Sequence, residues 1–267
     1  MRVNLHSRLF QHNGGSTHEK PPNLFEWDFF GKNNKVTVYI DGDYIKGIND
    51  KWSDIKILWL LESKHFSRGA HEFVSKNTEI IINEFDEVWT HDLNLIKLHP
   101  KFKWVPGMGS WIKKPKLHNK TKHISMITSN KQMTPQQKYR VNFALENKNK
   151  LDLFGRGFKH INNKEEGLSD YMFSVCIEND TYDTYFTEKI LDCFMTGTIP
   201  VFKGSKKITH HFNDKSIIFL DDINDLDFLS SDFYYENMES IKENLEISTE
   251  YENLDDWIYK KHLIKYN

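Results

Sequence analysis

The feature that most restricts the fold is a series of short apolar runs, each followed closely by polar or small residues. Every run is four to seven residues long and apolar on both faces, which is typical of buried parallel strands. The segments between the runs have room for helices. The runs cover residues 36–40, 55–61, 124–128, 151–154, 172–177, 199–202 and 216–220. This series predicts the α/β fold class.

The polar residues that follow these runs are candidate site residues, because ligands in open α/β sheets bind at the carboxyl ends of the strands. Glu62, Ser129 and Asn130 each follow such a run. Glu178 and Asn179 follow another. We therefore expect these side chains to lie at a sheet edge where a ligand can bind.

Charge and cysteine content exclude several classes of protein. The chain has 36 Lys and Arg against 38 Asp and Glu, a net charge of -2, so no basic field exists to attract nucleic acid. Cys176 and Cys193 match neither a zinc ligand pair nor a disulfide framework, which indicates a reducing compartment. No apolar run approaches the ~20 residues that cross a bilayer, and no signal-peptide stretch is present. We expect a soluble, cytoplasmic protein that binds no nucleic acid.

Length and one cationic stretch predict the domain organisation. At roughly 150 residues per domain, 267 residues allow two small domains. Residues 113–121 are cationic, contain one proline and have almost nothing to bury, so they predict a linker. We predict an N-terminal acceptor-side lobe over 1–120, a donor-binding lobe over 121–245 and a helical tail over 246–267.

The segment 171–201 predicts a strand, a polar loop, a helix and a second strand. Thr187 suits an N-cap and Gly197 suits the left-handed stop, so the helix begins at Glu188 and Lys189. A lysine in the first turn opposes the helix dipole unless an anion is bound. Backbone N–H groups and Lys189 could together hold a phosphate. From the residues alone, a diphosphate site and a solvated lysine are equally open.

The same segment resembles the donor-binding signature of the α1,3-fucosyltransferase family, glycosyltransferase family 10. Members of that family carry a phenylalanine, a Glu-Asn pair, a tyrosine, a Thr-Glu-Lys triplet that opens a helix, and a Pro-Val pair. The matching positions are Phe173, Glu178, Asn179, Tyr185, Thr187, Glu188, Lys189, Gly197, Pro200 and Val201. Ser129-Asn130, Arg140, Leu153 to Arg156 and Trp59 to Ser63 are also similar to the family. The resemblance covers residues 55–245.

The resemblance implies a GT-B architecture, with two Rossmann-like lobes facing a central cleft. It implies inverting transfer of fucose from GDP-fucose to a hydroxyl of a glycan acceptor. Arg140 and Lys189 fit the task of holding the diphosphate, and Glu188 that of accepting hydrogen bonds from ribose or fucose hydroxyls. No cofactor is required in this interpretation, and a divalent metal is at most stimulatory. The other expected donor-binding residues are Asn179, Tyr185, Ser129 and Asn130.

Glu62 is the candidate catalytic base. In an inverting displacement, a carboxylate must remove the proton of the acceptor hydroxyl as that hydroxyl attacks the sugar carbon. Glu62 ends a strand that is predicted to be buried on both faces, and burial would raise its pKa toward neutrality. A glutamate salt-bridged at a lobe edge is the alternative interpretation.

Two other functions stay open. Asp41-Gly42-Asp43 follows an apolar run, and such a D-x-D could hold a metal on a nucleotide diphosphate, as in GT-A glycosyltransferases. A transferase fold without chemistry would instead be a non-catalytic nucleotide-sugar binding protein. Retention of Glu62, Arg140 and Lys189 favours an enzyme.

Two remaining sequence features concern the histidines and the C-terminal tail. The thirteen histidines, among them His65, His71, His91 and His99, lack cysteine or carboxylate partners at ligand spacing, so we expect surface or loop residues and no metal site. The basic and aromatic tail 255–267 could make weak peripheral contact with an anionic membrane. Packing against the lobes is the alternative for this tail.

Overall fold

The computed structural model describes residues 1–7, 14–223 and 225–267. Its contacts divide the chain into two compact units. Unit 1 comprises residues 1–109, 182–185 and 253–267, and unit 2 comprises residues 110–181 and 186–252. Each unit contains one sheet whose paired strands are all parallel, so the α/β class is confirmed.

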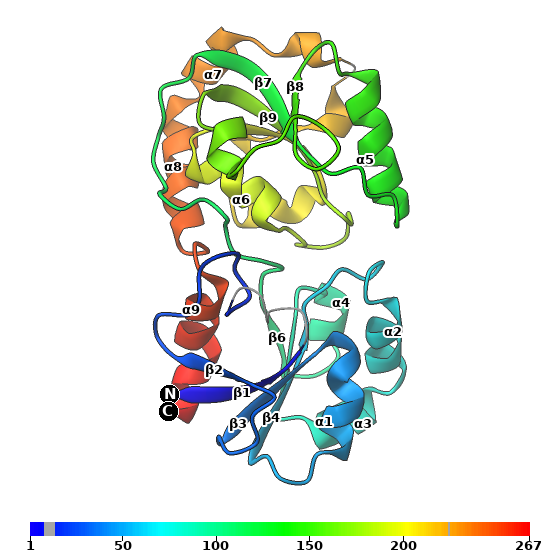
Figure 1. The fold of residues 1–267 in the computed structure, drawn as a ribbon. Helices are drawn as coiled ribbons and strands as arrows, with labels where there is room; N and C mark the ends of the chain where they lie inside the picture. Colours follow the sequence, from blue (N-terminus) through cyan, green and yellow to red (C-terminus); the bar gives the residue numbers. More distant parts are fainter. Residues whose placement is uncertain (8–13, 224) are drawn as a thin grey trace. The chain divides into compact units, whose positions relative to one another are not determined.

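Unit 1 is built on a sheet with the strand order β2-β1-β3-β4-β5-β6. Helices α1 to α4 lie on one side of this sheet and α9 lies on the other (Figure 1). The strands are β1 (Arg2–His6), β2 (Glu26–Phe29), β3 (Val36–Ile40), β4 (Ile55–Leu60), β5 (Glu87–Thr90) and β6 (Phe102–Trp104). The helices are α1 (Tyr44–Asn49), α2 (Arg68–Lys76), α3 (Thr78–Glu84), α4 (Leu93–Ile96) and α9 (Leu254–Ile258).

Alternate side chains of β4 show how this sheet is buried on both faces. Leu58 and Leu60 are fully buried in a cluster with Val74 of α2. Trp59 points to the opposite face, where its ring meets that of Trp89 edge-on at 5.9 Å. Because both faces exclude water, the strand is a continuous apolar run rather than an alternating one.

Unit 2 is built on a sheet with the strand order β11-β10-β9-β7-β8. Its strands are β7 (Lys122–Ile127), β8 (Asp152–Phe154), β9 (Tyr171–Ile177), β10 (Ile199–Lys203) and β11 (Ile218–Phe219). Its helices are α5 (Pro135–Glu146), α6 (Glu188–Met195), α7 (Ser231–Glu236) and α8 (Met238–Thr249).

The central strand β9 separates two environments in unit 2. Phe173 and Val175 face a core cluster that includes Ala144 of α5 and Ile241 of α8. Cys176 faces the other way, and its sulfur lies 3.2 Å from that of Cys193 on α6. The helix α6 therefore covers the face of the sheet opposite the main core, and its first turn meets the carboxyl end of β9.

Six of the seven apolar runs form strands, as predicted, whereas the run 216–220 forms only the two-residue strand β11 between the 3-10 turns Asp214–Ser216 and Leu220–Asp222. The strands β1, β2, β5 and β6 are additional, and β1 shows why the sequence did not reveal them. Asn4 is a polar residue that is fully buried in β1, where its amide donates to the carbonyl of Asn34 and the hydroxyl of Thr37, both at 2.9 Å. Hydrogen bonds thus replace the apolar pattern that a sequence-based prediction needs.

The observed units divide the chain differently from the boundaries at residues 120 and 245. The chain leaves unit 1 after residue 109, returns to it for residues 182–185 and again from 253, and residue 245 lies inside α8. The expected solvated linker over 113–121 is wrong at its end, because Lys120 is buried in unit 2. Its ammonium donates to carbonyls of Leu168, Ser169 and Thr196, and burial lowers its pKa to about 7.

The C-terminal tail packs within unit 1. Asp255 accepts hydrogen bonds from the backbone and hydroxyl of Ser16, and Trp257 meets Trp104 edge-on at 5.6 Å. Ile258 and Leu263 are fully buried. Apolar side chains that the predicted membrane contact would need are therefore packed inside unit 1.

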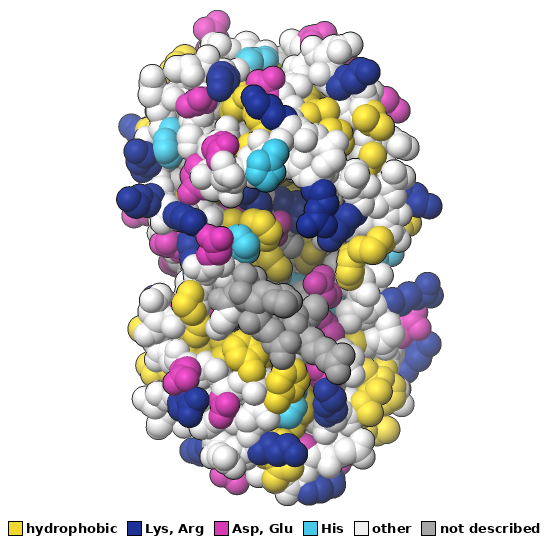
Figure 2. Space-filling view, viewed as in Figure 1, with side chains coloured by type: hydrophobic (Ala, Val, Ile, Leu, Met, Phe, Trp, Pro, Cys, Tyr) yellow, Lys and Arg dark blue, Asp and Glu magenta, His cyan; other side chains and the backbone are white. Residues whose placement is uncertain are grey.

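Two surface properties bear on partners. In the part of the chain that the structure describes, no helix is long and apolar enough to cross a bilayer. Figure 2 shows Lys and Arg side chains interspersed with Asp and Glu on the viewed face, in keeping with the net charge of -2.

Candidate functional site

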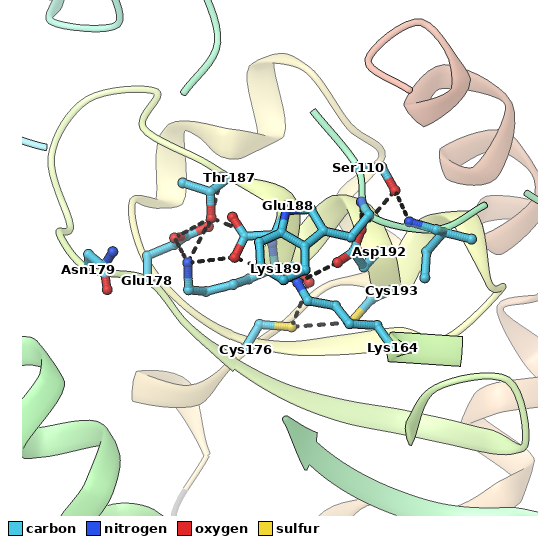
Figure 3. Close-up of polar contacts among 12 residues, drawn as sticks. Ser110, Lys164, Cys176, Glu178, Asn179, Thr187, Glu188, Lys189, Asp192 and Cys193 are labelled. Atoms are coloured by element: carbon cyan, nitrogen blue, oxygen red, sulfur yellow. Dashed lines mark hydrogen bonds and ion pairs between the residues drawn. The ribbon is translucent and has the colours of Figure 1, made fainter. Parts of the chain in front are cut away.

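The candidate site in unit 2 lies where β9 ends and α6 begins. Six residues gather there, and we call them the α6 cluster: Arg140, Glu178, Asn179, Thr187, Glu188 and Lys189. Figure 3 shows the members of the cluster other than Arg140. Their positions follow from local structure. Thr187 is the N-cap of α6, as predicted. Gly197 lies just beyond the other end of α6 at a φ of 68°, and a Cβ at this position would come within 2.4 Å of the Leu117 side chain.

Glu178 anchors the first turn of α6. It is fully buried, and its carboxylate accepts hydrogen bonds from the backbone N–H of Thr187 at 2.8 Å and from the Thr187 hydroxyl at 2.8 and 2.9 Å. A buried carboxylate needs such donors and a nearby cation. The cation is Lys189, whose Nζ lies 3.4 Å from Glu178 Oε2.

Lys189 lies between two carboxylates. Its ammonium is 3.2 Å from Glu188 Oε1 and 3.0 Å from the hydroxyl of Thr187. Burial opposes the charged form of Lys189, but the charges of Glu178 and Glu188 outweigh burial and raise its pKa above the ordinary value. Lys189 is therefore a cation, with 19% of its side chain exposed.

Glu188 is ionised. Burial alone would raise the pKa of this carboxyl, but the charges of Lys189 and Lys164 lower it to about 2. The nearer contact is to Lys189, and Lys164 Nζ lies 3.6 Å from Glu188 Oε1. An ionised carboxylate only accepts hydrogen bonds, so it suits hydroxyl groups and repels phosphate.

Arg140 of α5 reaches the same place. It is 7% exposed, and its Nη1 donates to the carbonyl of Ile177 at 3.2 Å and to Asn179 Oδ1 at 3.3 Å. The charge of Arg140 lowers the pKa of Lys189, which shows that the two cations repel each other. Arg140 is therefore a buried side chain rather than a surface arginine.

Ser129 and Asn130 follow β7, which pairs directly with β9, so they lie at the same edge of the sheet. Ser129 is half-buried and Asn130 is exposed, and the Asn130 N–H donates to the carbonyl of Arg156 at 3.0 Å. Gly157, at a φ of 91°, allows this close approach, because a Cβ there would lie 2.7 Å from the Asn130 amide.

Tyr185 belongs to unit 1 rather than to the α6 cluster. Its ring is 3% exposed, stacks with Tyr182 at 5.5 Å and meets His91 edge-on at 4.8 Å. The predicted role of Tyr185 in donor binding stays a prediction.

Glu62 lies in unit 1, two residues beyond β4, and is half-buried. Three side chains form hydrogen bonds with the backbone of Leu61 and Glu62. Asp41 accepts from the N–H groups of Leu61 and Glu62, the former at 3.1 Å. His91 contacts the Leu61 carbonyl at 3.1 Å, and His71 contacts the Glu62 carbonyl at 3.0 Å.

This arrangement corrects the expectation that the histidines are surface or loop residues. His71 and His91 are 5% and 1% exposed, and their rings stack at 6.0 Å. Burial lowers the pKa of His91 to about 3, so this ring is neutral. Sequence alone could not reveal this role, because Nε2 of each ring contacts a backbone carbonyl of the 61–62 segment.

The two carboxylates of the D-x-D segment have separate partners. Asp41 points toward the backbone of Leu61 and Glu62, whereas Asp43 lies 2.8 Å from Lys46. Burial, and then the charge of Glu62, raise the pKa of Asp41 to about 7. Within residues 1–7, 14–223 and 225–267, no three His, Cys, Asp or Glu side chains are grouped so that they could hold a metal. The geometry does not favour a metal shared by Asp41 and Asp43.

The sequence predicted no role for three charged residues near the start of α6: Lys164, Glu178 and Asp192. Of these, Glu178 was a matching position of the family signature. Lys164 Nζ lies 2.6 Å from Asp192 Oδ2, and Asp192 is 1% exposed. The one available signal was Asp192 itself, a charged residue on the apolar face of a predicted helix.

Comparison with known proteins gives a consistent result. A family described as "Glycosyltransferase family 10 (fucosyltransferase) C-term" matches residues 117–260, more than half of the chain. The alpha-(1,3)-fucosyltransferase FucT of Helicobacter pylori is 40% identical over 68 residues. That match covers 26% of this chain and only 14% of the H. pylori protein.

Solved structures share the fold. A crystal structure of an α1,3-fucosyltransferase with GDP has a TM-score of 0.56 at 17% identity, covering 100% of this chain and 88% of the other. One with GDP-fucose has a TM-score of 0.51 at 16% identity, covering 93% and 81%. This likeness confirms the expected fold class, with two Rossmann-like units of the GT-B type.

Proposed function

Since the chain belongs to glycosyltransferase family 10, we propose that it transfers fucose from GDP-fucose to a hydroxyl of a glycan acceptor, with inversion at the anomeric carbon. The observation that carries this proposal is the α6 cluster, which gathers two cations, Arg140 and Lys189, and two carboxylates, Glu178 and Glu188, around the first turn of a helix. The name of the H. pylori relative and the GDP and GDP-fucose in the related structures support the same donor here.

In this proposal, Arg140 and Lys189 bind the diphosphate. The two cations repel each other in the α6 cluster, and an anion between them would remove that repulsion. Backbone N–H groups at the start of α6 add further donors. Because the diphosphate gains negative charge as the glycosidic bond breaks, these groups stabilise the transition state more than the bound substrate.

Glu188 binds hydroxyl groups of the donor. Its carboxylate is ionised and accepts hydrogen bonds only, so ribose or fucose hydroxyls are suitable partners. Asn179, which is half-buried beside Glu178, supplies an amide to the same donor, and Ser129 and Asn130 lie at the same sheet edge.

Glu62 is the proposed base. The acceptor oxygen forms a bond to the fucose carbon, its proton passes to the Glu62 carboxylate, and GDP leaves with the bonding electrons. The clamp formed by Asp41, His71 and His91 fixes the backbone of Glu62, which a base needs for a constant distance to the proton.

We also propose that transfer requires no metal, because two cationic side chains are available to the diphosphate. A chelator should then leave turnover of GDP-fucose intact. Complete loss of turnover that manganese restores would overturn this part of the proposal.

A thermal-shift panel of GDP, UDP, ADP and CMP tests the donor assignment. A ligand at a hundred times its Kd stabilises the native state by about 2.7 kcal/mol, so the preferred nucleotide stands out. We expect GDP to give the largest shift and GDP-fucose to exceed other GDP-sugars. Selective stabilisation by UDP would overturn the assignment, and GDP binding without turnover on any acceptor would favour a non-catalytic binding protein.

A further inference from the structure

We propose that Lys164 is a positioning residue of the donor site, which fixes the Glu188 carboxylate by linking it to Asp192 one turn further along α6. The inference rests on the proposed function, because that function gives Glu188 its task. It assigns a role to a lysine outside the matched signature.

Lys164 is held in place by its own turn. It opens the 3-10 turn Lys164–Gly167, and Asn163 and Glu166 form a capping box around that turn. The Asn163 amide oxygen accepts from the Glu166 N–H at 3.2 Å, and Glu166 Oε1 accepts from the Asn163 N–H at 3.3 Å. A side chain that leaves from such a fixed turn has few alternative positions.

The Lys164 side chain is also enclosed. It is 15% exposed, and its ammonium lies 4.2 Å from the centre of the Trp111 ring. The same ammonium is 2.6 Å from Asp192 Oδ2 and 3.6 Å from Glu188 Oε1. Figure 3 shows Lys164 reaching toward α6 with these contacts.

Asp192 is a fixed anchor for this lysine. Its Oδ1 accepts from the Ser110 hydroxyl at 2.7 Å and from the Trp111 N–H at 2.8 Å. Asp192 therefore cannot turn away from Lys164 without breaking two hydrogen bonds in the interior. The chain of contacts runs from Ser110 through Asp192 and Lys164 to Glu188.

The two lysines beside Glu188 differ in whether their interaction with Glu188 persists when the donor binds. Lys189 is the cation that the proposed function directs at the diphosphate, so its interaction with Glu188 weakens when the donor binds. Lys164 stays with Asp192 and Glu188 in both states. Without Lys164, donor binding would leave the buried Glu188 with too little positive charge, and a buried uncompensated carboxylate is strongly destabilising.

The charged groups around Glu188 define the titration. Burial favours the protonated form of Glu188, and Lys189 and Lys164 oppose protonation. Asp192, one turn away, is a second carboxyl group, and burial raises its own pKa. Removal of Lys164 should therefore raise the pH at which Glu188 takes up a proton. A protonated Glu188 would donate where the donor hydroxyls require an acceptor.

The test compares the full chain with the variants Lys164→Met, Lys164→Arg and Lys150→Met. Lys150 is the matched control, because its ammonium also bridges two carboxylates of unit 2, at 2.5 Å from Asp225 and 2.9 Å from Asp227. The first measurement is the titration of the Glu188 side-chain carbon by NMR, assigned with Glu188→Gln. We expect the midpoint to rise by about one pH unit or more in Lys164→Met, and to stay in place in Lys164→Arg and Lys150→Met.

The second measurement is kcat and KM for GDP-fucose against pH. Lys164→Met should raise KM about tenfold at neutral pH and move the acid limb of kcat/KM upward, whereas Lys164→Arg should restore most of both. If Lys164→Met does not fold, Lys164→Gln keeps an amide that can donate to Asp192 and removes only the charge, so it should shift the midpoint in the same direction.

Three outcomes would contradict either the positioning role of Lys164 or the proposed function. An unchanged Glu188 midpoint in Lys164→Met overturns the positioning role. A loss of thermal stability without any change in midpoint or pH profile assigns Lys164 a structural role only and also overturns it. If the wild-type chain binds no GDP while Lys164→Met still shifts the Glu188 midpoint, the proposed function is overturned and the electrostatic link between Lys164 and Glu188 stands.

Discussion

The carboxylate of Asp41 accepts hydrogen bonds from the backbone N–H of Glu62, at 3.4 Å from Oδ1 and 3.3 Å from Oδ2. Asp41 itself has a φ of 47°, a left-handed conformation that is costly for a residue other than glycine. The D-x-D segment therefore contributes a strained, buried carboxyl group that holds the proposed base in place. Burial favours the protonated form of this carboxyl group, so we expect its proton to contribute to the stability of unit 1.

The Asp41→Asn substitution should change how stability depends on pH. The native pKa of Asp41 is raised from 3.8 to about 7, so its contribution is present below pH 4 and is lost as the pH rises toward 7. Asparagine carries no proton to lose. As the pH rises from 4 to 8, the unfolding free energy of the wild type should fall relative to that of the variant by an amount on the order of 4 kcal/mol.

Urea unfolding followed by tryptophan fluorescence measures this difference. Six of the seven tryptophans lie in unit 1, so the signal reports mainly on the unit that contains Asp41. A difference between variant and wild type that stays constant over this pH range would show that Asp41 titrates normally in the native state.

The Glu62→Gln substitution should abolish transfer while leaving the donor site unchanged. Glutamine cannot accept the acceptor proton, and loss of a general base lowers kcat by about 10²- to 10⁴-fold. Calorimetry with GDP should give the wild-type affinity, because Glu62 lies in unit 1 and the α6 cluster lies in unit 2. Undiminished turnover in Glu62→Gln would show that another group removes the proton.

The Arg140→Gln substitution should weaken GDP binding. Hydrogen bonds to charged groups contribute about 1.5–3 kcal/mol, so the loss of the guanidinium should raise Kd by about tenfold to a hundredfold. The glutamine amide can still donate to the carbonyl of Ile177, which keeps the fold effect small. Lys150→Met is the control, and equal affinity in Arg140→Gln and wild type would remove Arg140 from the diphosphate site.

The Lys189→Met substitution should destabilise unit 2, because it leaves the fully buried Glu178 without its cation. Breaking a buried ion pair by removing one partner costs about 3–5 kcal/mol. The double variant Glu178→Gln/Lys189→Met should recover part of this loss, since glutamine needs no counter-charge. If Glu178→Gln costs the same stability in the wild type as in the Lys189→Met background, Glu178 and Lys189 do not interact energetically.

The thiol of Cys176 should be unreactive in the native protein. Burial, reinforced by the nearby Cys193, raises the pKa of Cys176 well above its ordinary value, and only the thiolate is a strong nucleophile. A thiol reagent at pH 8 should modify Cys176 slowly in buffer and rapidly in urea, as read by mass spectrometry of peptides. Rapid modification without denaturant would contradict the buried position.

Much of this structure follows from local sequence signals. The apolar runs predicted the central strands of both sheets, because strands buried on both faces leave a continuous pattern. Thr187 and Gly197 predicted both ends of α6, since capping chemistry acts within a few residues. The signature predicted that Asn179, Glu188 and Lys189 belong to one site, and all three lie in the α6 cluster.

The rest depends on contacts between distant residues. Nothing local links Asp41 to Glu62, Lys164 to Asp192, or Asn253 to the N-terminal segment, where its amide donates to the carbonyl of Pro21 at 2.9 Å. Lys120 lies in a stretch that looks like a solvated linker, yet four oxygens around its ammonium satisfy it in the interior. Buried polar partners of this kind leave no periodic pattern in the sequence.

The most direct test of the central claim is to incubate the chain with GDP-fucose and a panel of glycans, and to measure GDP and fucosylated product by chromatography and mass spectrometry. The account predicts GDP and product in equal amounts with at least one glycan, inverted configuration at the fucose carbon by NMR, and loss of both in Glu62→Gln. Intact GDP-fucose with every glycan, despite tight binding of GDP, or preferential turnover of a UDP-sugar would contradict it.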